Sequence, residues 1–238
     1  MWYTVCVLRF KPEDVFSPAA PAALPATAET VIAALSPLLT DARRSRIDAV
    51  VTQRTRRVVP VLDGLIDPHN IAAVLRSADA FGVQDIHVIE HTDPFLASHR
   101  VAQGTEQWLD VIRHHDARSC AVHLRERGYR LLWASMDGEI TPENLNRAGR
   151  TAIIFGNEHA GVSVEAERLC DGRYTIPMRG FVESLNVSVA NAITLQAATV
   201  GRSGDLSPGE QLTLRARFMM LSVDRAAEIV AEYQRRVP

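Results

Sequence analysis

The chain has few cysteines. Cys6, Cys120 and Cys170 are odd in number and far apart among its 238 residues. This spacing excludes a disulfide framework and forms no cysteine-rich metal motif. We therefore expect a reducing compartment, the cytoplasm, and no metal site.

Long apolar runs are also missing. No segment approaches the roughly 18 apolar residues that a membrane-spanning helix needs. The apolar start at residues 2–8 is short for a signal peptide and has no basic leader. The alanine-rich stretch at residues 24–28 resembles a cleavage site, so export stays open as an alternative. We expect no membrane segment.

Positive charge is scarce overall, with Lys11 the only lysine and a formal net charge of −2. A phosphate-binding protein usually has an excess of Lys and Arg somewhere. Here the excess is local, and its six arginines are Arg43, Arg44, Arg46, Arg54, Arg56 and Arg57. Contact with nucleic-acid phosphate and a solvated helix face are both open for this patch.

The composition is that of a folded protein, with 47% hydrophobic and 23% charged residues. Residues 17–28 are rich in Pro and Ala, which indicates an extended linker. We therefore divide the chain into a Pro/Ala-rich appendage without packed structure, an Arg-rich helical extension, a main domain and a C-terminal helical extension. Their ranges are 1–28, 29–57, 58–202 and 203–238.

Short apolar runs alternate with helical patterns along most of the chain. Strands are expected at 58–65, 85–90, 108–112, 129–136, 151–155 and 174–178. Helices are expected at 30–51, 71–82, 117–127, 187–200 and 207–234. This alternation predicts an α/β fold with a mostly parallel sheet flanked by helices.

Three loops that follow expected strands hold the polar residues, which is where open α/β sheets bind ligands. The first is Asp67-Pro-His-Asn70, where Asn70 is a candidate helix N-cap. Arg76 interrupts the apolar helix that follows. It lies about 600° further round the helix than Asn70, so the two can flank one pocket rim.

The second loop runs from Phe155 to Gly161, and its glycines allow a ligand to approach the backbone. Glu158 in this loop has no obvious local partner. A plain turn is the alternative, since the loop lacks the dinucleotide-binding glycine pattern.

The third loop, residues 180–188, places Ser184 and Asn186 at a helix start, where backbone N–H groups are available to a ligand. Simple capping is the alternative reading. Capping does not account for the neighbouring Pro177, Met178, Gly180 and Leu185, which form an apolar wall suited to an adenine ring.

Residues 67–79, 154–162, and 176–178 with 183–190 resemble the three motifs of the SpoU (TrmH) branch of the SPOUT methyltransferases, in order and at suitable spacing. The resemblance extends from about residue 54 to the C-terminus. It implies an S-adenosyl-L-methionine-dependent RNA 2′-O-ribose methyltransferase, with a C-terminal trefoil knot and a homodimeric assembly. The helical extensions resemble those of the branch that modifies a guanosine of the tRNA D-loop, position 18. The Pro/Ala-rich segment at residues 1–28 does not resemble that branch.

The resemblance also implies roles for individual residues. Arg76 matches the catalytic arginine, but a guanidinium with a pKa above about 12 is a poor base, so we expect it to engage a phosphate and the 2′-oxygen. The residues expected to hold Arg76 and the ribose are Asn70, Glu158, Ser184 and Asn186. Those expected at the cofactor are Ala134, Gly156, Asn157, Gly161, Ile176, Met178 and Leu185. Contacts to RNA are expected from Arg54, Arg56 and Arg57, and the reaction needs no metal.

Three alternatives remain. The same residues fit a methyltransferase for rRNA or for another tRNA position. A catalytically inactive RNA-binding protein of the same shape is a second alternative. A nucleotide-dependent oxidoreductase is the third, weakened by the missing glycine fingerprint.

Overall fold

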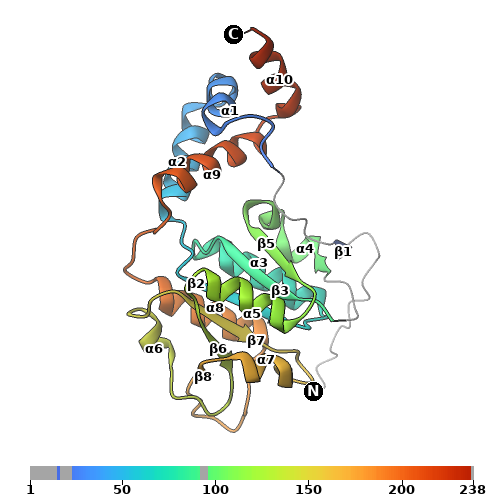
Figure 1. The fold of residues 1–238 in the computed structure, drawn as a ribbon, viewed down its shortest axis with the longest axis vertical. Coiled ribbons are helices and arrows are strands. Elements are labelled where there is room, and N and C mark those ends of the chain that lie inside the picture. The colour runs from blue at the N-terminus through green and yellow to red at the C-terminus, as the bar shows by residue number, and fades with distance from the viewer. Residues whose placement is uncertain (1–14, 17–22, 92–95, 237–238) are drawn as a thin grey trace, which may run out of the picture.

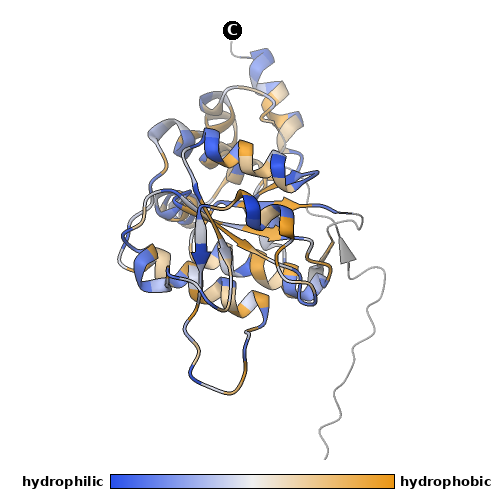
Figure 2. Ribbon diagram, turned by 60° about the horizontal axis from the view of Figure 1, so that its bottom comes forward, coloured by the Kyte–Doolittle hydropathy of each residue, from blue (hydrophilic) through white to orange (hydrophobic). Residues whose placement is uncertain are grey.

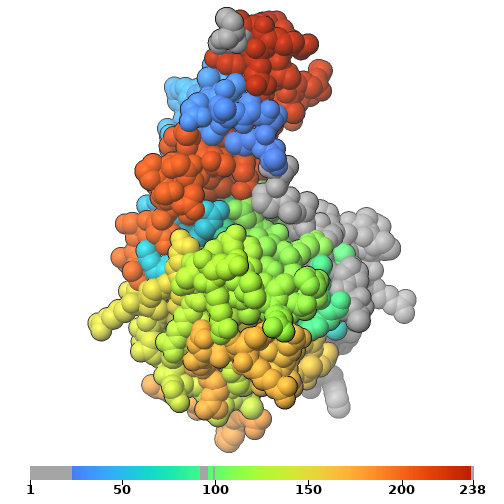
Figure 3. Space-filling model, viewed as in Figure 1, coloured from blue at the N-terminus to red at the C-terminus, as the bar shows by residue number. Residues whose placement is uncertain are grey.

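The computed structural model describes residues 15–16, 23–91 and 96–236. The expected appendage at 1–28 therefore lies largely outside the described residues. Within the described ranges, a helical unit stands at one end of a sheet domain (Figure 1), and it projects clearly from the surface of that domain (Figure 3).

The sheet domain is built on six parallel strands in the order β5-β3-β2-β7-β6-β8. They are β2 (Val58–Asp63), β3 (Asp85–Ile89), β5 (Asp110–His114), β6 (Arg130–Ala134), β7 (Thr151–Phe155) and β8 (Gly172–Tyr174). The chain begins in the middle at β2, adds β3 and β5 on one side, and then crosses to the other. This reversal between β2 and β7 is the position at which open α/β sheets form a ligand crevice.

Helices cover both faces of the sheet (Figure 2). One face carries α3 (Pro68–Ala80), α4 (His99–Ala102), α6 (Pro142–Leu145) and α8 (Val187–Thr199). The other carries α5 (Ala117–Glu126) and α7 (Val164–Leu169). Consecutive residues such as Ile153 and Ile154 enter opposite cores and both are buried. Burial on both faces explains why the strands are continuous apolar runs.

The two ends of the chain form the helical unit together. It contains α1 (Ala28–Leu35), the 3₁₀ turn η2 (Ser36–Leu38), α2 (Asp41–Gln53), α9 (Pro208–Met220) and α10 (Ala226–Arg236). Leu35 and Val51 from the first extension share a buried core with Phe218 and Val230 from the second. The unit is thus one small bundle, although about 150 residues of sequence separate its halves.

Several element boundaries differ from the expectation. The helix expected at 30–51 is interrupted around Pro37, which has no N–H to continue the helical bonding. The helix expected at 207–234 is also two helices, because Arg225 adopts a φ of 57°. The strand expected at 108–112 begins later, with Trp108 in the 3₁₀ turn η3 (Thr105–Trp108). The strand expected at 174–178 ends at Tyr174, and a loop follows.

A small antiparallel pair joins β1 (Val15–Phe16) to β4 (Ala97–Ser98). Among the described helices, none has the length and apolar character needed to cross a bilayer.

Candidate active site

The three loops meet at the side chain of Asn70. Its Nδ2 donates to Oε1 of Glu158 at 2.8 Å, and its Oδ1 accepts from Nδ2 of Asn186 at 2.9 Å. The expected capping role was wrong, because Asp67 caps α3 by accepting from the backbone N–H of His69. Asn70 instead lies buried in the first turn of α3 and joins segments 88 and 116 residues away.

Asn186 combines both roles considered for it. It caps α8, since its Oδ1 accepts from the backbone N–H of Ser188 at 2.9 Å. Its Nδ2 donates to Asn70, so the start of α8 is held against the start of α3. Ser184 lies two residues before this cap and is exposed on the loop that follows β8.

Arg76 is exposed on α3, where its Nη1 approaches the carbonyl oxygen of Val101 at 3.5 Å. It is not hydrogen-bonded to Asn70, Glu158 or Asn186 among the described contacts. Six residues of helix carry it about 9 Å along the axis from Asn70. The guanidinium is therefore accessible to a ligand.

The loop after β7 is tightly closed on itself. A Cβ at Gly156 would lie 2.0 Å from the carbonyl carbon of Gly161, so only glycine fits there. Gly161 has a φ of +72°, which also favours glycine. Asn157 and Gly161 exchange two backbone hydrogen bonds at 3.0 and 2.9 Å. The glycine at 156 is thus explained by backbone packing within the loop.

The side chain of Asn157 holds this loop to the end of β2. Its Nδ2 donates to the carbonyl oxygen of Gly64 at 2.8 Å, and its Oδ1 accepts from the backbone N–H groups of His159 and Ala160. These hydrogen bonds engage both polar atoms of the Asn157 side chain. Asn157 therefore supports the expected cofactor loop by holding it in place. Glu158, the next residue, is exposed, and its Oε1 accepts the hydrogen bond from Asn70.

An apolar surface lies at the ends of the neighbouring strands β6 and β8. Ala134 and Ile176 pack against the core there and remain partly exposed. Met178 and Leu185 are also half-buried on the connection to α8. Apolar side chains next to the backbone N–H groups of a helix start fit an adenosyl group with its polar edges.

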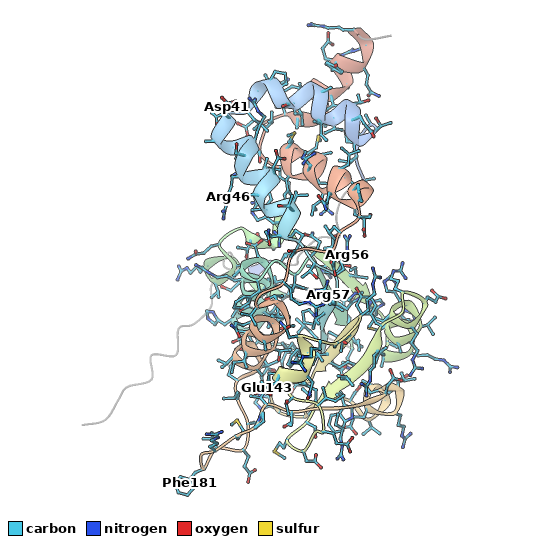
Figure 4. All side chains as sticks on the ribbon, turned by 90° about the vertical axis from the view of Figure 1, so that its left-hand side faces the viewer. Asp41, Arg46, Arg56, Arg57, Glu143 and Phe181 are labelled. Carbon is cyan, nitrogen blue, oxygen red and sulfur yellow. The ribbon has the colours of Figure 1, made fainter. Side chains whose placement is uncertain are left out.

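The connection from β8 to α8 projects from the domain, at the end opposite the helical unit (Figure 4). Phe181 at its tip is fully exposed, at 108% of its reference area, and Val182 beside it is 62% exposed. Such apolar exposure on a loop is unusual for a surface facing only water.

The arginines expected at RNA have different positions. Arg54 is 1% exposed and is ion-paired with Asp79, so its expected phosphate contact was wrong. Arg56 pairs at 2.8 Å with each of three carboxylates, those of Asp85, Asp110 and Glu210. These pairs join the sheet domain to α9 and engage all three guanidinium nitrogens of Arg56 with carboxylates.

Arg57 remains partly exposed and pairs with Asp205 at 3.4 Å. It lines a cleft of about 440 Å³ between the sheet domain and α2. Arg46 on α2 and Arg202 after α8 line the same cleft, and Arg46 is exposed (Figure 4). The sequence did not single out Arg202, because it lies about 145 residues beyond the arginine patch.

Comparisons with known proteins identify relatives of this chain. The chain is 36% identical to a tRNA (guanosine(18)-2'-O)-methyltransferase of Thermus thermophilus over 157 residues, which cover 66% of this chain and 81% of that protein. It is 31% identical to the Escherichia coli protein of the same description, with 66% and 69% covered.

Two solved structures share the fold. The first is the A. aeolicus TrmH/SpoU tRNA modifying enzyme, with a TM-score of 0.68, 25% identity, and 78% of this chain and 98% of that chain covered. The second is the SpoU methyltransferase AviRb from Streptomyces viridochromogenes in complex with AdoMet, with a TM-score of 0.54, 25% identity, and 63% and 60% covered. The profile of the family described as SpoU rRNA Methylase matches residues 57–196. The chain therefore belongs to the SpoU rRNA Methylase family.

Proposed function

We propose that this protein transfers a methyl group from S-adenosyl-L-methionine to the ribose 2′-hydroxyl of guanosine 18 in the tRNA D-loop. The observation that carries the proposal is the junction of Asn70, Glu158 and Asn186, which brings the three motif loops together beside an apolar surface. The descriptions of the tRNA-modifying relatives support the choice of nucleotide. A tRNA substrate agrees with the expected cytoplasmic location.

The cofactor, when bound, supplies an electrophilic methyl group on its sulfonium. The apolar surface around Ala134, Ile176 and Leu185 and the N–H groups at the start of α8 orient the adenosyl group. The hydrogen bonds of Asn70 fix the loops after β7 and before α8 relative to α3. A fixed geometry is what an in-line transfer between two bound molecules requires.

Arg76 is the catalytic residue of the proposal. A guanidinium is a poor base, so the proton of the 2′-hydroxyl goes to solvent water and not to Arg76. Arg76 binds a phosphate of the RNA and stabilises the negative charge that develops on the 2′-oxygen. The exposed position of Arg76 on α3 leaves it free to do so.

We also propose a homodimer and a trefoil knot around the cofactor loops, as the family resemblance implies. Val189 and Ile193 on α8 and Val200 at its C-cap form an exposed apolar row, at 46%, 37% and 56% exposure. A second copy of the chain would cover this row together with Phe181 and Val182. For RNA contact we propose Arg46, Arg57 and Arg202 in the cleft below α2.

The test is methylation of tRNA and rRNA transcripts by the purified full chain, with the modified nucleotide mapped. We expect a single 2′-O-methylguanosine at position 18 of tRNA. The family also contains 23S rRNA methyltransferases similar to this chain, at 35% identity over 147 residues. Methylation of rRNA alone would therefore replace the tRNA proposal with that one.

The matched variant is Arg76→Ala, with the exposed Arg118→Ala on α5 as its control. We expect Arg76→Ala to lower methyl transfer by about a hundredfold or more, while calorimetric binding of S-adenosylhomocysteine stays within a few-fold. Activity within a few-fold of wild type would refute the role of Arg76. Binding of NAD without binding of S-adenosylhomocysteine would refute the methyltransferase itself.

A further inference from the structure

Three histidines and a cysteine converge beneath α5, outside the active site described above. Nδ1 of His87 and Nε2 of His114 share a hydrogen bond of 3.0 Å. The potential ligand atoms of His87, His114 and Cys120 all lie within 4.8 Å of one another. The ring of His123 lies beside them, with its centroid 5.3 Å from that of His87 and 5.1 Å from that of His114.

Local structure explains the convergence. His87 on β3 is paired with Ile112 of β5, and His114 lies two residues after Ile112, so both histidines point to the same face of the sheet. Cys120 and His123 are three residues apart on α5, which places them on one side of that helix. Because α5 covers this face, Cys120 and His123 on the helix lie against His87 and His114 on the strands.

The cluster is separate from the proposed methyl-transfer site. Asn70 and Asn186 belong to α3 and the start of α8, which cover the opposite face of the sheet. The α5 face of the sheet has a hydrophobic core of its own, which includes Cys120. The mechanism proposed above uses none of the four side chains.

The two strand histidines are buried, at 1% and 7% exposure, and Cys120 is 1% exposed. In the part of the chain that the structure describes, no carboxylate accepts a hydrogen bond from either ring. One nitrogen of the hydrogen-bonded pair must be unprotonated to accept the bond, so the pair already offers a nitrogen lone pair that a metal ion can use.

We propose that His87, His114 and Cys120 bind one Zn²⁺ ion, with His123 as the fourth ligand at the more exposed edge. Nitrogen and sulfur donors select zinc over magnesium or calcium. On binding, the proton shared by the two rings moves to the non-ligating nitrogen of its own ring, so both rings stay neutral, and the proton of the thiol goes to solvent. The site is structural, since it joins β3, β5 and α5 and leaves no position for a substrate.

The geometry requires only small adjustments. Zn–N bonds of about 2.0 Å and Zn–S bonds of about 2.3 Å place the tetrahedral ligand atoms of such a site roughly 3.3 to 3.5 Å apart. The present separations run from 3.0 Å, between the two ring nitrogens, up to 4.8 Å. For these three ligands, side-chain shifts of about 1 Å therefore suffice. His123, whose ring centroid lies 5.3 and 5.1 Å from those of His87 and His114, must turn toward the metal to become the fourth ligand. The proposal departs from the expectation of no metal site, because the ligands come from three segments that the sequence does not link.

Charge near the cluster is mixed. Arg127 disfavours a cation close to His87 and His114, whereas Asp63 lies near enough to Cys120 to favour one. The thiol itself becomes negative on binding, since zinc deprotonates a coordinating cysteine. The bound site then carries a net charge of about +1 before these neighbours are counted.

The experiment uses the full chain without an affinity tag, stripped with a chelator and titrated with Co²⁺ and then Zn²⁺. We expect one ion per chain, tetrahedral d–d absorption, a thiolate-to-cobalt charge-transfer band, and displacement of Co²⁺ by Zn²⁺. Absence of the charge-transfer band, or no binding, would overturn the proposal and leave a hydrogen-bonded histidine pair in an ordinary core.

Matched variants locate the site. Cys120→Ser and His114→Gln should weaken Zn²⁺ binding by about a hundredfold or more, whereas Cys170→Ser and His115→Gln should leave it within about twofold. An equal effect of the control variants would overturn the assignment. If Cys120→Ser does not fold, as judged by circular dichroism, X-ray absorption of the zinc-loaded wild type decides. Sulfur and nitrogen neighbours support the site, and oxygen neighbours alone refute it.

Discussion

Nδ2 of Asn70 lies 2.8 Å from Oε1 of Glu158, although 88 residues separate the two in sequence. The other end of the same amide accepts from Asn186. Asn70 thus needs a donor on one side and an acceptor on the other, which is what a primary amide offers and a carboxylate does not. The pair holds the loop after β7 against the start of α3.

Replacing this amide by a carboxylate tests its role. Asn70→Asp would place a second negative charge next to Glu158, and the two loops would separate. We expect methyl transfer to fall by about a hundredfold, because displacements of about 1 Å have effects of that size. The rate of methyl transfer is measured in a single-turnover methylation assay. Gln107→Glu makes the same chemical change at an exposed position and should leave the rate unchanged; an equal loss there would contradict the prediction.

The backbone of the same loop gives a second prediction. A methyl group at Gly156 would meet the Gly161 backbone at 2.0 Å, so Gly156→Ala must push the loop open. We expect the free energy of unfolding in urea to fall by about 3 kcal/mol, and S-adenosylhomocysteine binding to weaken. Gly149→Ala is the control, since nothing lies within 4 Å of its added Cβ. Equal stability of the two variants would refute the packing argument.

Much of the fold was predictable from local pattern. Residues 151–155 form a strand with the expected boundaries, because a continuous apolar run buried on both faces has only one regular conformation available in a parallel sheet. The fold class of helices on a parallel sheet was confirmed, as was the family. The trefoil knot, the dimer and the remaining site roles stay predictions.

Contacts between distant segments were not predictable. The sequence predicted a helix-cap role for Asn70, because a sequence shows the local surroundings of a residue and gives no sign of partners 88 or 116 positions away. Arg54 and Arg56 read as a basic surface for the same reason. The partners of Arg56, Asp85 and Asp110, stand at the starts of two later strands, and only the strand order brings them together, while Arg54 pairs with Asp79 on α3.

Arg56 is expected to stabilise the joint between the sheet domain and the helical unit. Its partners Asp85, Asp110 and Glu210 lose their shared cation in Arg56→Met. Asp110 keeps Arg217 at 2.6 Å, whereas the partly buried carboxylate of Asp85 has no second cation among the described contacts. We expect the unfolding free energy to fall by about 3 kcal/mol, at the lower end of values for buried pairs because Arg56 is partly exposed. Arg225→Met is the control, since its ion pair is exposed and contributes below about 1 kcal/mol. Similar effects of both variants would contradict this role.

The histidine cluster makes stability depend on pH in the metal-free protein. The pKa of His87 is about 3 and that of His114 about 4 in the folded state, whereas both are near 6.5 when unfolded. Below pH 6.5 the unfolded chain therefore binds protons that the folded chain does not. Stability should stay level above pH 7 and fall as the pH drops toward 4. The charged or titratable groups that act on these two rings are His115, Asp116, His123 and Arg127.

Between pH 7 and pH 5 the loss should be about 2 to 4 kcal/mol, at 1.36 kcal/mol for each pKa unit and for one or both rings. Urea unfolding of chelator-treated protein at pH 7.5, 6.0 and 5.0 measures it. The double variant His87→Gln/His114→Gln keeps a hydrogen bond between the side chains and removes their titration, so its stability should change less over this range. His115→Gln, at an exposed ring, should keep the wild-type slope. A wild-type stability that is level from pH 7.5 to 5.0 would show that the two rings are protonated as easily in the folded protein as in the unfolded chain.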